Sequence, residues 1–161
     1  MGAIEIRGCW RSTAAVEDVW EVLTDLSTWP QWWPAINHVE AVDASTDRHE
    51  AARLTFDTRP PLRPLVTTLR IVDRTAPSRL EVVIDDGPLG GYGTFTIDPD
   101  PEGSAARYDV SLSVRSLLFR PIEPILRGAT RSSGRARLVR AGADLARLAG
   151  GEPLPAPEAT R

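Results

Sequence analysis

Few side chains in this sequence could carry acid–base chemistry, and the histidines are the first to consider. His38 lies two residues before Glu40, so both side chains fall on one side of a predicted strand. A histidine that is oriented by a carboxylate can act as a general base. A surface strand histidine beside an acid gives the same pattern, and we favour that simpler interpretation. His49 lies in the polar turn over residues 45–50, where we expect solvent exposure.

Arginine and tyrosine side chains are the other weak candidates for catalysis: Arg53, Arg70, Tyr92 and Tyr108. Both arginines occupy polar positions of alternating strand patterns, which favours the solvent side. An arginine that pointed inward would need an anionic or carbonyl-bearing ligand, because an unpaired buried guanidinium costs too much free energy. A tyrosine could donate a proton, although a tyrosine in the core or at a rim is the more common case. We therefore assign no catalytic role at this stage.

Composition excludes or disfavours several kinds of chemistry. Cys9 is the only cysteine and the chain has two histidines, so we expect no metal site. All 19 basic residues are arginine, which excludes a lysine Schiff base. The sequence has no Gly-x-Ser-x-Gly nucleophile motif, and the glycine-rich run over 87–93 lacks the lysine of a phosphate loop. We predict no cofactor.

Charge and hydrophobicity bound the class of protein. With 161 residues, 42% of them hydrophobic, the chain suits one globular domain. A net charge of −3 argues against general nucleic-acid binding. No window has the roughly 18 consecutive apolar residues of a membrane span. The first residues lack the basic and apolar regions of an export signal, so we expect a cytoplasmic protein.

Two helices are predicted where four of the five tryptophans are crowded, between residues 19 and 34. The first helix is indicated by apolar residues at helical spacing, namely Val16, Val19, Trp20 and Leu23. Ser12 or Thr13 would cap its N-terminus. A second, short helix over 28–34 tolerates a proline in its first turn.

The tryptophans should have different roles. Trp20 lies on the apolar side of the first helix and belongs to the core. We expect Trp29 and Trp32 to anchor the short helix and Trp33 to face the interior. Because these rings are large, their crowding indicates a deep apolar core or an apolar pocket wall.

Alternating apolar and polar residues predict strands before and after these helices. The first strand covers residues 3–11, and later strands lie near 52–57, 65–72, 80–84, 95–97 and 108–114. Short turns between the later strands predict an antiparallel meander. A long helix is predicted over 117–148, followed by a proline-rich tail over 150–161 that should be disordered.

A resemblance to a known family rests on the tryptophan region. The residues that carry it are Val19-Trp20, Leu23, Asp25, Trp29-Pro30 and Trp33-Pro34. This pattern after a strand resembles the START-like, helix-grip superfamily, and is most similar to small bacterial polyketide cyclase/dehydrase-like proteins. The resemblance implies an α+β, helix-grip fold for residues 1–149. A curved antiparallel sheet of about seven strands would wrap a long C-terminal helix, with two short helices closing one end.

The same resemblance implies binding of one hydrophobic or aromatic small molecule, lipid-like or polyketide-like, in an internal cavity. The expected lining residues are Trp33, Phe56, Tyr92, Tyr108 and Leu126. The alternative is a polyketide cyclase or aromatase-type dehydratase that acts on a carrier-bound substrate through arginine and tyrosine side chains. Convergent polar side chains, including an inward arginine or histidine, would favour the enzyme, and an apolar cavity would favour the binder. The tyrosine that such enzymes place after the tryptophan–proline segment falls at Ile36.

A row of arginines is expected on the C-terminal helix, opposite its apolar face: Arg120, Arg127, Arg131 and Arg135. From residue 115 to residue 149 the chain has eight arginines and two acids. We favour the interpretation that this row is the solvated side of an amphipathic helix. The sharper hypothesis is a docking surface for an acidic partner, either an acyl carrier protein or an anionic membrane surface.

Overall fold

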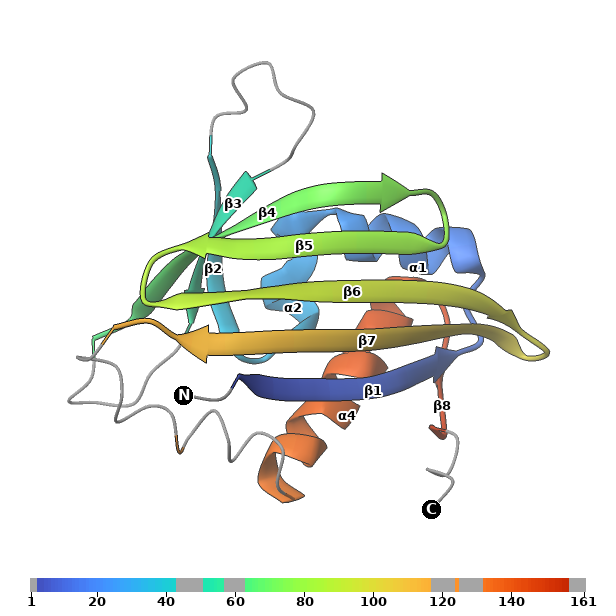
Figure 1. The fold of residues 1–161 in the computed structure, drawn as a ribbon. Helices are drawn as coiled ribbons and strands as arrows, with labels where there is room; N and C mark the ends of the chain where they lie inside the picture. The colour runs from blue at the N-terminus through green and yellow to red at the C-terminus, as the bar shows by residue number, and fades with distance from the viewer. Residues whose placement is uncertain (1–2, 43–50, 57–62, 117–123, 125–131, 157–161) are drawn as a thin grey trace.

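The fold is given by a computed structural model that describes residues 3–42, 51–56, 63–116, 124 and 132–156. Its main feature is one antiparallel sheet of eight strands, in the order β2-β3-β4-β5-β6-β7-β1-β8. The sheet is strongly curved, and the helices lie against one of its faces (Figure 1). The predicted α+β fold with a curved antiparallel sheet is therefore confirmed, with eight strands in the described part of the chain where about seven were expected.

The strands follow the predicted meander. They are β1 (Ile4–Ser12), β2 (Ile36–Val42), β3 (Ala51–Phe56), β4 (Leu65–Thr75), β5 (Arg79–Asp86), β6 (Leu89–Asp100), β7 (Gly103–Val114) and β8 (Pro153–Leu154). From β2 to β7 each strand pairs with the next one along the chain. β1 then pairs with β7, so the beginning of the chain lies beside its later strands.

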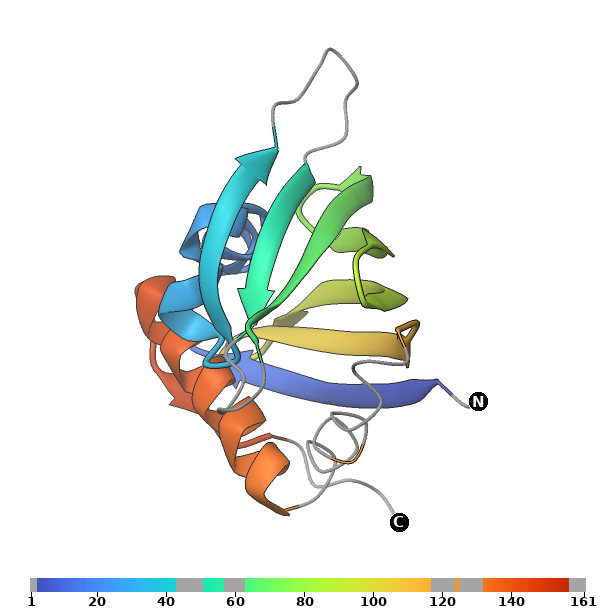
Figure 2. The ribbon, with the colours of Figure 1, turned by 90° about the vertical axis from the view of Figure 1, so that its left-hand side faces the viewer.

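The helices share the concave side of the sheet. They are α1 (Val16–Thr24), the 3-10 turn η1 (Leu26–Thr28), α2 (Trp29–Trp32) and α4 (Ser132–Leu148). Figure 2 shows α1, α2 and α4 on the same side of the curved sheet. The buried residues of α1 are Val19, Trp20 and Leu23, as the helical spacing predicts.

The first helix does not use the predicted caps. Ala15 occupies the N-cap of α1 without a side-chain hydrogen bond. The Ser12 hydroxyl instead shares a hydrogen bond with the Ser104 hydroxyl, and the Thr13 hydroxyl accepts one from the Glu152 N–H. Both side chains therefore join the end of β1 to other segments of the chain.

The C-terminal helix is described from Ser132 onward. The earlier part of the predicted helix lies outside the described residues, apart from Pro124, and so do Arg120, Leu126, Arg127 and Arg131. Ala141, Leu145 and Ala146 are buried in the described part. This half of α4 packs its apolar side against α1 and α2 and against β1 and β8 at one edge of the sheet.

α4 lies close to β1 at a glycine. A Cβ atom on Gly142 would lie 2.3 Å from Cδ1 of Trp10. In addition, the Trp10 indole N–H donates to the Leu138 carbonyl at 2.9 Å. The contact between β1 and α4 thus depends on the missing side chain of Gly142.

We predict that Gly142→Ala destabilises the protein, although alanine is the better helix former. Overpacking costs about 1–3 kcal/mol, whereas helix propensity returns only about 1 kcal/mol. Trp10 is held by neighbouring rings and cannot move aside without loss. Urea denaturation should therefore give a lower free energy of unfolding. As a calibration, Ala136→Gly on the exposed side should lose about 1 kcal/mol through propensity alone. A Gly142→Ala protein that is more stable than the wild type would contradict the prediction.

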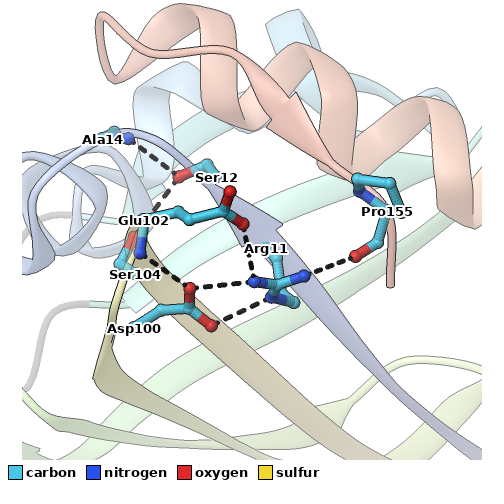
Figure 3. A network of polar contacts seen from close by, with 7 residues as sticks. All are labelled: Arg11, Ser12, Ala14, Asp100, Glu102, Ser104 and Pro155. Atoms are coloured by element: carbon cyan, nitrogen blue, oxygen red, sulfur yellow. Dashed lines mark hydrogen bonds and ion pairs between the residues drawn. The ribbon is translucent and has the colours of Figure 1, made fainter. Parts of the chain in front are cut away.

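A polar network joins three segments that are distant in the sequence: the end of β1, the β6–β7 turn and the C-terminal residues (Figure 3). Arg11 donates two hydrogen bonds of 2.9 Å to the Asp100 carboxylate. Their side chains are only 22% and 13% exposed. Arg11 also donates to Glu102 and to the Pro155 carbonyl. The bidentate pair is directional and joins β1 to the β6–β7 turn, and the hydrogen bond to the Pro155 carbonyl adds the C-terminal segment.

The tail that we expected to be disordered from residue 150 begins with ordered chain. Pro153 and Leu154 form β8 and pair with Ser12 and Arg11 of β1. Residues 157–161 of the tail lie outside the described residues. The physical reason is that the Arg11 guanidinium donates a hydrogen bond to the Pro155 carbonyl. This bond holds the first part of the tail beside β1.

Asp100→Asn should remove an acid-sensitive part of the stability. Hydrogen bonds from Arg11 and from the Glu102 N–H lower the pKa of Asp100 below its ordinary 3.8. A carboxyl pKa that is lower in the folded state adds stability above the unfolded-state pKa, and this stability is lost as the pH falls through the folded-state pKa. The difference in free energy of unfolding between wild type and variant should thus be largest near neutral pH and shrink below about pH 4.

The matched control for this prediction is Asp98→Asn in the same hairpin. Asp98 pairs with Arg107, and both of those side chains are well exposed. An exposed pair contributes little to stability, so this variant should stay close to the wild type in urea denaturation. A difference between wild type and Asp100→Asn that stays constant from neutral pH to acid would contradict the assignment.

Candidate functional site

The face of the sheet that the helices cover is called the inner face here. Directly opposed residues of antiparallel strands point to the same face. One such row runs from Gly8 in β1 through Tyr108 and Phe95 to Leu80 in β5. Tyr108, Phe95 and Leu80 are all buried, so this row identifies the inner face.

Six aromatic side chains pack together on this face and form what we call the aromatic cluster: Trp10, Trp29, Trp32, Trp33, Phe95 and Tyr108. Trp33 stacks on Trp29 with 5.8 Å between ring centroids and 14° between planes. Trp10 meets Trp32 and Trp33 edge-on, at 5.7 Å and 5.9 Å. Each such pair contributes about 0.5–1.5 kcal/mol beyond its buried area, so the cluster stabilises the junction of sheet and helices.

Hydrogen bonds hold the two tryptophans of α2 in place. The Trp29 indole N–H donates to the Leu23 carbonyl at 2.9 Å, and the Trp32 indole N–H donates to the Thr28 hydroxyl at 3.4 Å. Both acceptors belong to the preceding chain, in α1 and η1. The four-residue helix is therefore anchored by its tryptophans, as the sequence indicated.

Part of the inner face remains accessible to solvent. Apolar side chains on this face that touch the core and yet stay only half-buried include Ile6, Trp33, Phe56, Val110, Leu112 and Val114. Ile6 and Val110 oppose each other across β1 and β7, next to the row of Gly8 and Tyr108. An apolar surface that the described residues leave partly accessible is suited to an apolar ligand.

Tyr108 places a hydroxyl among these apolar groups. Its ring lies against Trp10, with 4.3 Å between the ring centroids. Its Oη lies 2.1 Å from the position that a Cβ atom on Gly8 would occupy, so the side chain leans across onto β1. Burial raises the pKa of Tyr108 to about 12, while the positive charge of Arg135 acts in the opposite direction. At neutral pH the hydroxyl is therefore protonated and can donate a hydrogen bond.

Three of the five predicted ligand contacts lie on the inner face: Trp33, Phe56 and Tyr108. Their contact with a ligand stays a prediction. Tyr92 lies on the outer face and is 57% exposed, because it is an odd number of residues from Phe95 in the same strand. It therefore does not line the interior. Leu126 lies outside the described residues.

Both candidate arginines lie on the outer face and pair with acids there. Arg53 lies 3.6 Å from Glu40, and Arg70 lies 3.3 Å from Asp85. About half of each arginine side chain is exposed, at 52% and 48%. The guanidinium groups keep their hydration in this position, which avoids the cost of burying a charge.

The remaining catalytic candidates do not converge either. His38 is exposed on the outer face, opposite Thr55. Of the five candidates, Tyr108 alone lies on the inner face.

In the described part of the chain, no group of three or more histidine, cysteine or acidic side chains could hold a metal ion, and Cys9 is a free thiol. None of the helices described here has the length and hydropathy needed to cross a membrane.

Three members of this site were not predicted from the sequence: Trp10, Phe95 and Gly8. Alternation places Trp10 on the apolar side of the first strand and Phe95 in a later strand. However, only the pairing of β7 with both β1 and β6 brings them beside Tyr108. A glycine opposite a tyrosine is a usable signal once this register is known, because it leaves room for the ring to lean over.

Comparison with known proteins relates this geometry to a family. The sequence family described as "Polyketide cyclase / dehydrase and lipid transport" matches residues 10–146. A search of curated proteins finds no match.

Solved structures with a similar fold are distant in sequence. One is a protein from Thermus thermophilus, with 16% identity, a TM-score of 0.69, and 90% of this chain and 96% of that chain covered. Another is a START superfamily protein from Mycobacterium smegmatis, with 18% identity, a TM-score of 0.66, and coverage of 87% and 94%. A third is the Zhui aromatase/cyclase from a Streptomyces species, with 14% identity, a TM-score of 0.67, and coverage of 91% and 93%. These likenesses establish the START-like, helix-grip fold.

We predict a late tyrosine ionisation that belongs to Tyr108. Its pKa of about 12 exceeds the ordinary 10, so the ultraviolet absorbance of tyrosinate should include a step near pH 12. Tyr108→Phe should remove this step, and Tyr92→Phe should leave it. Because the folded-state pKa is the higher one, the related stability is complete below about pH 10 and is lost as the pH rises toward 12. A late step that survives in Tyr108→Phe would rule out this assignment.

Proposed function

Because the chain belongs to the polyketide cyclase/dehydrase and lipid transport family, we propose that it binds one hydrophobic or aromatic small molecule, lipid-like or polyketide-like, against the inner face. The observation that carries this proposal is the accessible apolar surface there, formed by side chains such as Ile6, Phe56 and Val110. A ligand that covers such surface gains roughly 25 cal/mol per Å² of apolar area removed from water. Trp33 adds a half-buried aromatic ring to the same face.

Binding without catalysis is the interpretation that the placement of polar groups supports best. Arg53, Arg70 and His38 lie on the outer face, so none of them is inward as an enzyme of this kind would need. Of the five catalytic candidates, Tyr108 is then the one on the inner face, and none of the other four lies beside it. General acid–base catalysis needs such groups within hydrogen-bond reach of the reacting atoms.

A polyketide cyclase or aromatase-type dehydratase acting on a carrier-bound substrate is the second candidate. The observation that favours it is that a positive charge, that of Arg135, acts to lower the pKa of Tyr108 against the larger effect of burial. A protonated tyrosine and an arginine together could stabilise negative charge that develops on a carbonyl oxygen. The family description covers this activity as well as lipid transport.

An acidic partner, either an acyl carrier protein or an anionic membrane surface, belongs to the same proposal. Arg135 is the member of the predicted arginine row that the structure describes, and it is exposed together with Arg137. Farther along α4, Arg140 and Arg147 share Asp144. A surplus of positive charge on one helix attracts acidic partners in a salt-dependent manner.

A single free cysteine suits the cytoplasm, where we place the protein.

The proposed ligand surface can be tested with the neutral fluorescent dye Nile red. Val110→Gln puts a polar amide on the accessible inner face beside Ile6. An apolar ligand would bury this amide without a partner, which costs about 1–3 kcal/mol. Fluorescence titration should therefore show at least roughly fivefold weaker binding than in the wild type.

Val83→Gln is the matched control, because Val83 is also a half-buried strand valine but lies on the outer face opposite Tyr92. It should bind the dye as the wild type does. The proposal fails if the wild type does not bind Nile red, or if both valine variants lose binding equally.

If the dye results support the proposal, mass spectrometry of the gently purified protein would identify the natural ligand by its mass.

A further inference from the structure

We infer that two copies of this chain associate through their helices, with the acidic side of α1 in one copy against the arginine side of α4 in the other. The acidic side of α1 is formed by three exposed carboxylates: Glu17, Asp18 and Glu21. The arginine side of α4 is formed by three exposed guanidinium groups: Arg137, Arg140 and Arg147. This inference does not depend on a ligand at the inner face.

The acidic side of α1 lies opposite the buried side of the helix. None of its three carboxylates takes part in an ion pair among the residues that the structure describes. α1 contains no arginine, so its balance of charge is −3. The helix dipole favours Glu17 and Asp18 in the first turn, but it disfavours Glu21 in the last turn. Local helix stability therefore does not account for the whole acidic side.

α4 carries the opposite balance of charge. Ser132–Leu148 contains four arginines and one aspartate, which gives +3. Arg140 and Arg147 share that aspartate, Asp144. Arg137 is exposed and forms no ion pair with any described residue. α4 thus keeps positive charge that its own side chains do not neutralise.

The two charged sides belong to neighbouring helices. α1 and α4 contact each other, and both lie on the same side of the sheet (Figure 2). An acyl carrier protein or an anionic membrane that approached α4 would therefore also meet the like charge of α1. A second copy avoids this repulsion, because a two-fold rotation brings each acidic side onto an arginine side. The described charges favour a second copy for this reason.

Apolar side chains on α4 would be covered in the same interface. Val139, which directly precedes Arg140, is 65% exposed, and Leu148, which directly follows Arg147, is 40% exposed. Pairs of exposed charges contribute little stability by themselves. Burial of these two side chains would add the apolar contact that a specific interface contains.

The oligomeric state of the full chain tests the inference. At low ionic strength, sedimentation velocity should show a reversible monomer–dimer equilibrium. Raising the ionic strength from about 0.05 M to about 0.5 M screens exposed charges, so the dissociation constant of the dimer should rise by roughly tenfold or more.

Charge reversal identifies the two surfaces. Glu17→Arg combined with Glu21→Arg makes α1 positive. Arg137→Glu combined with Arg140→Glu makes α4 negative. Each double variant alone should be a monomer where the wild type is a dimer, because like charges then meet at both symmetric contacts. An equimolar mixture of the two should dimerise again, since every contact in the mixed dimer joins opposite charges.

The mixture also controls for misfolding, because two misfolded variants could not restore a dimer. Asp73→Arg is the matched control, since it reverses an exposed acid on the outer face opposite Glu81 and should keep the wild-type dissociation constant. The inference is overturned if the wild type is a monomer at low ionic strength, or if the dimer persists in both double variants. It is also overturned if their mixture stays monomeric, or if open chains of many copies form. A monomeric wild type that binds anionic lipid vesicles or an acyl carrier protein would assign the arginine side to that partner instead.

Discussion

The contact of Trp10 with α4 is the constraint on which the rest of the structure depends. Trp10 meets three rings of the aromatic cluster and also donates to the carbonyl of Leu138. Gly142 lets the helix come close enough for this hydrogen bond. One side chain therefore sets the distance between sheet and helix, orients Tyr108 and supports Trp33. Close packing of this kind leaves little freedom for any of these groups to shift alone.

The two faces of the sheet divide the charge and the apolar surface between them. Outer-face arginines such as Arg7, Arg53 and Arg70 find acids on neighbouring strands and stay hydrated. The inner face carries large apolar groups, and the hydroxyls of Ser12, Ser104 and Thr67 there are bonded in a pair or to the backbone. This division follows from the cost of burying an unpaired charge, which is far higher than that of burying an unpaired hydroxyl. The inner face is therefore largely apolar, as the binding of an apolar molecule requires.

Patterns that are local in the sequence predict much of this structure. Helical spacing predicts the buried side of α1, and alternation predicts the strands. Alternation also contains the signal that places Tyr92 outside: Phe95 and Ile97 are both buried, so Tyr92, at odd spacing from each of them, points to the opposite face. We predicted Tyr92 as a lining residue from its residue type, and the strand period overrides that prediction. For Tyr108 the residue type and the strand period agree.

Contacts between distant segments could not be predicted, because they depend on register and on the approach of whole elements. The pairing of Arg11 with Asp100 joins residues 89 positions apart, and the Trp10–Leu138 hydrogen bond joins residues 128 apart. Ser12 and Thr13 look like helix caps, yet the partners that the fold supplies outcompete the nearby helix N-terminus. The candidate site has the same origin, since Gly8 acquires its role only when β1 pairs with β7 and a tyrosine ring leans across it. Because that register also places Ile6 and Val110 beside the hydroxyl, a polar donor and an accessible apolar surface occur together on the inner face.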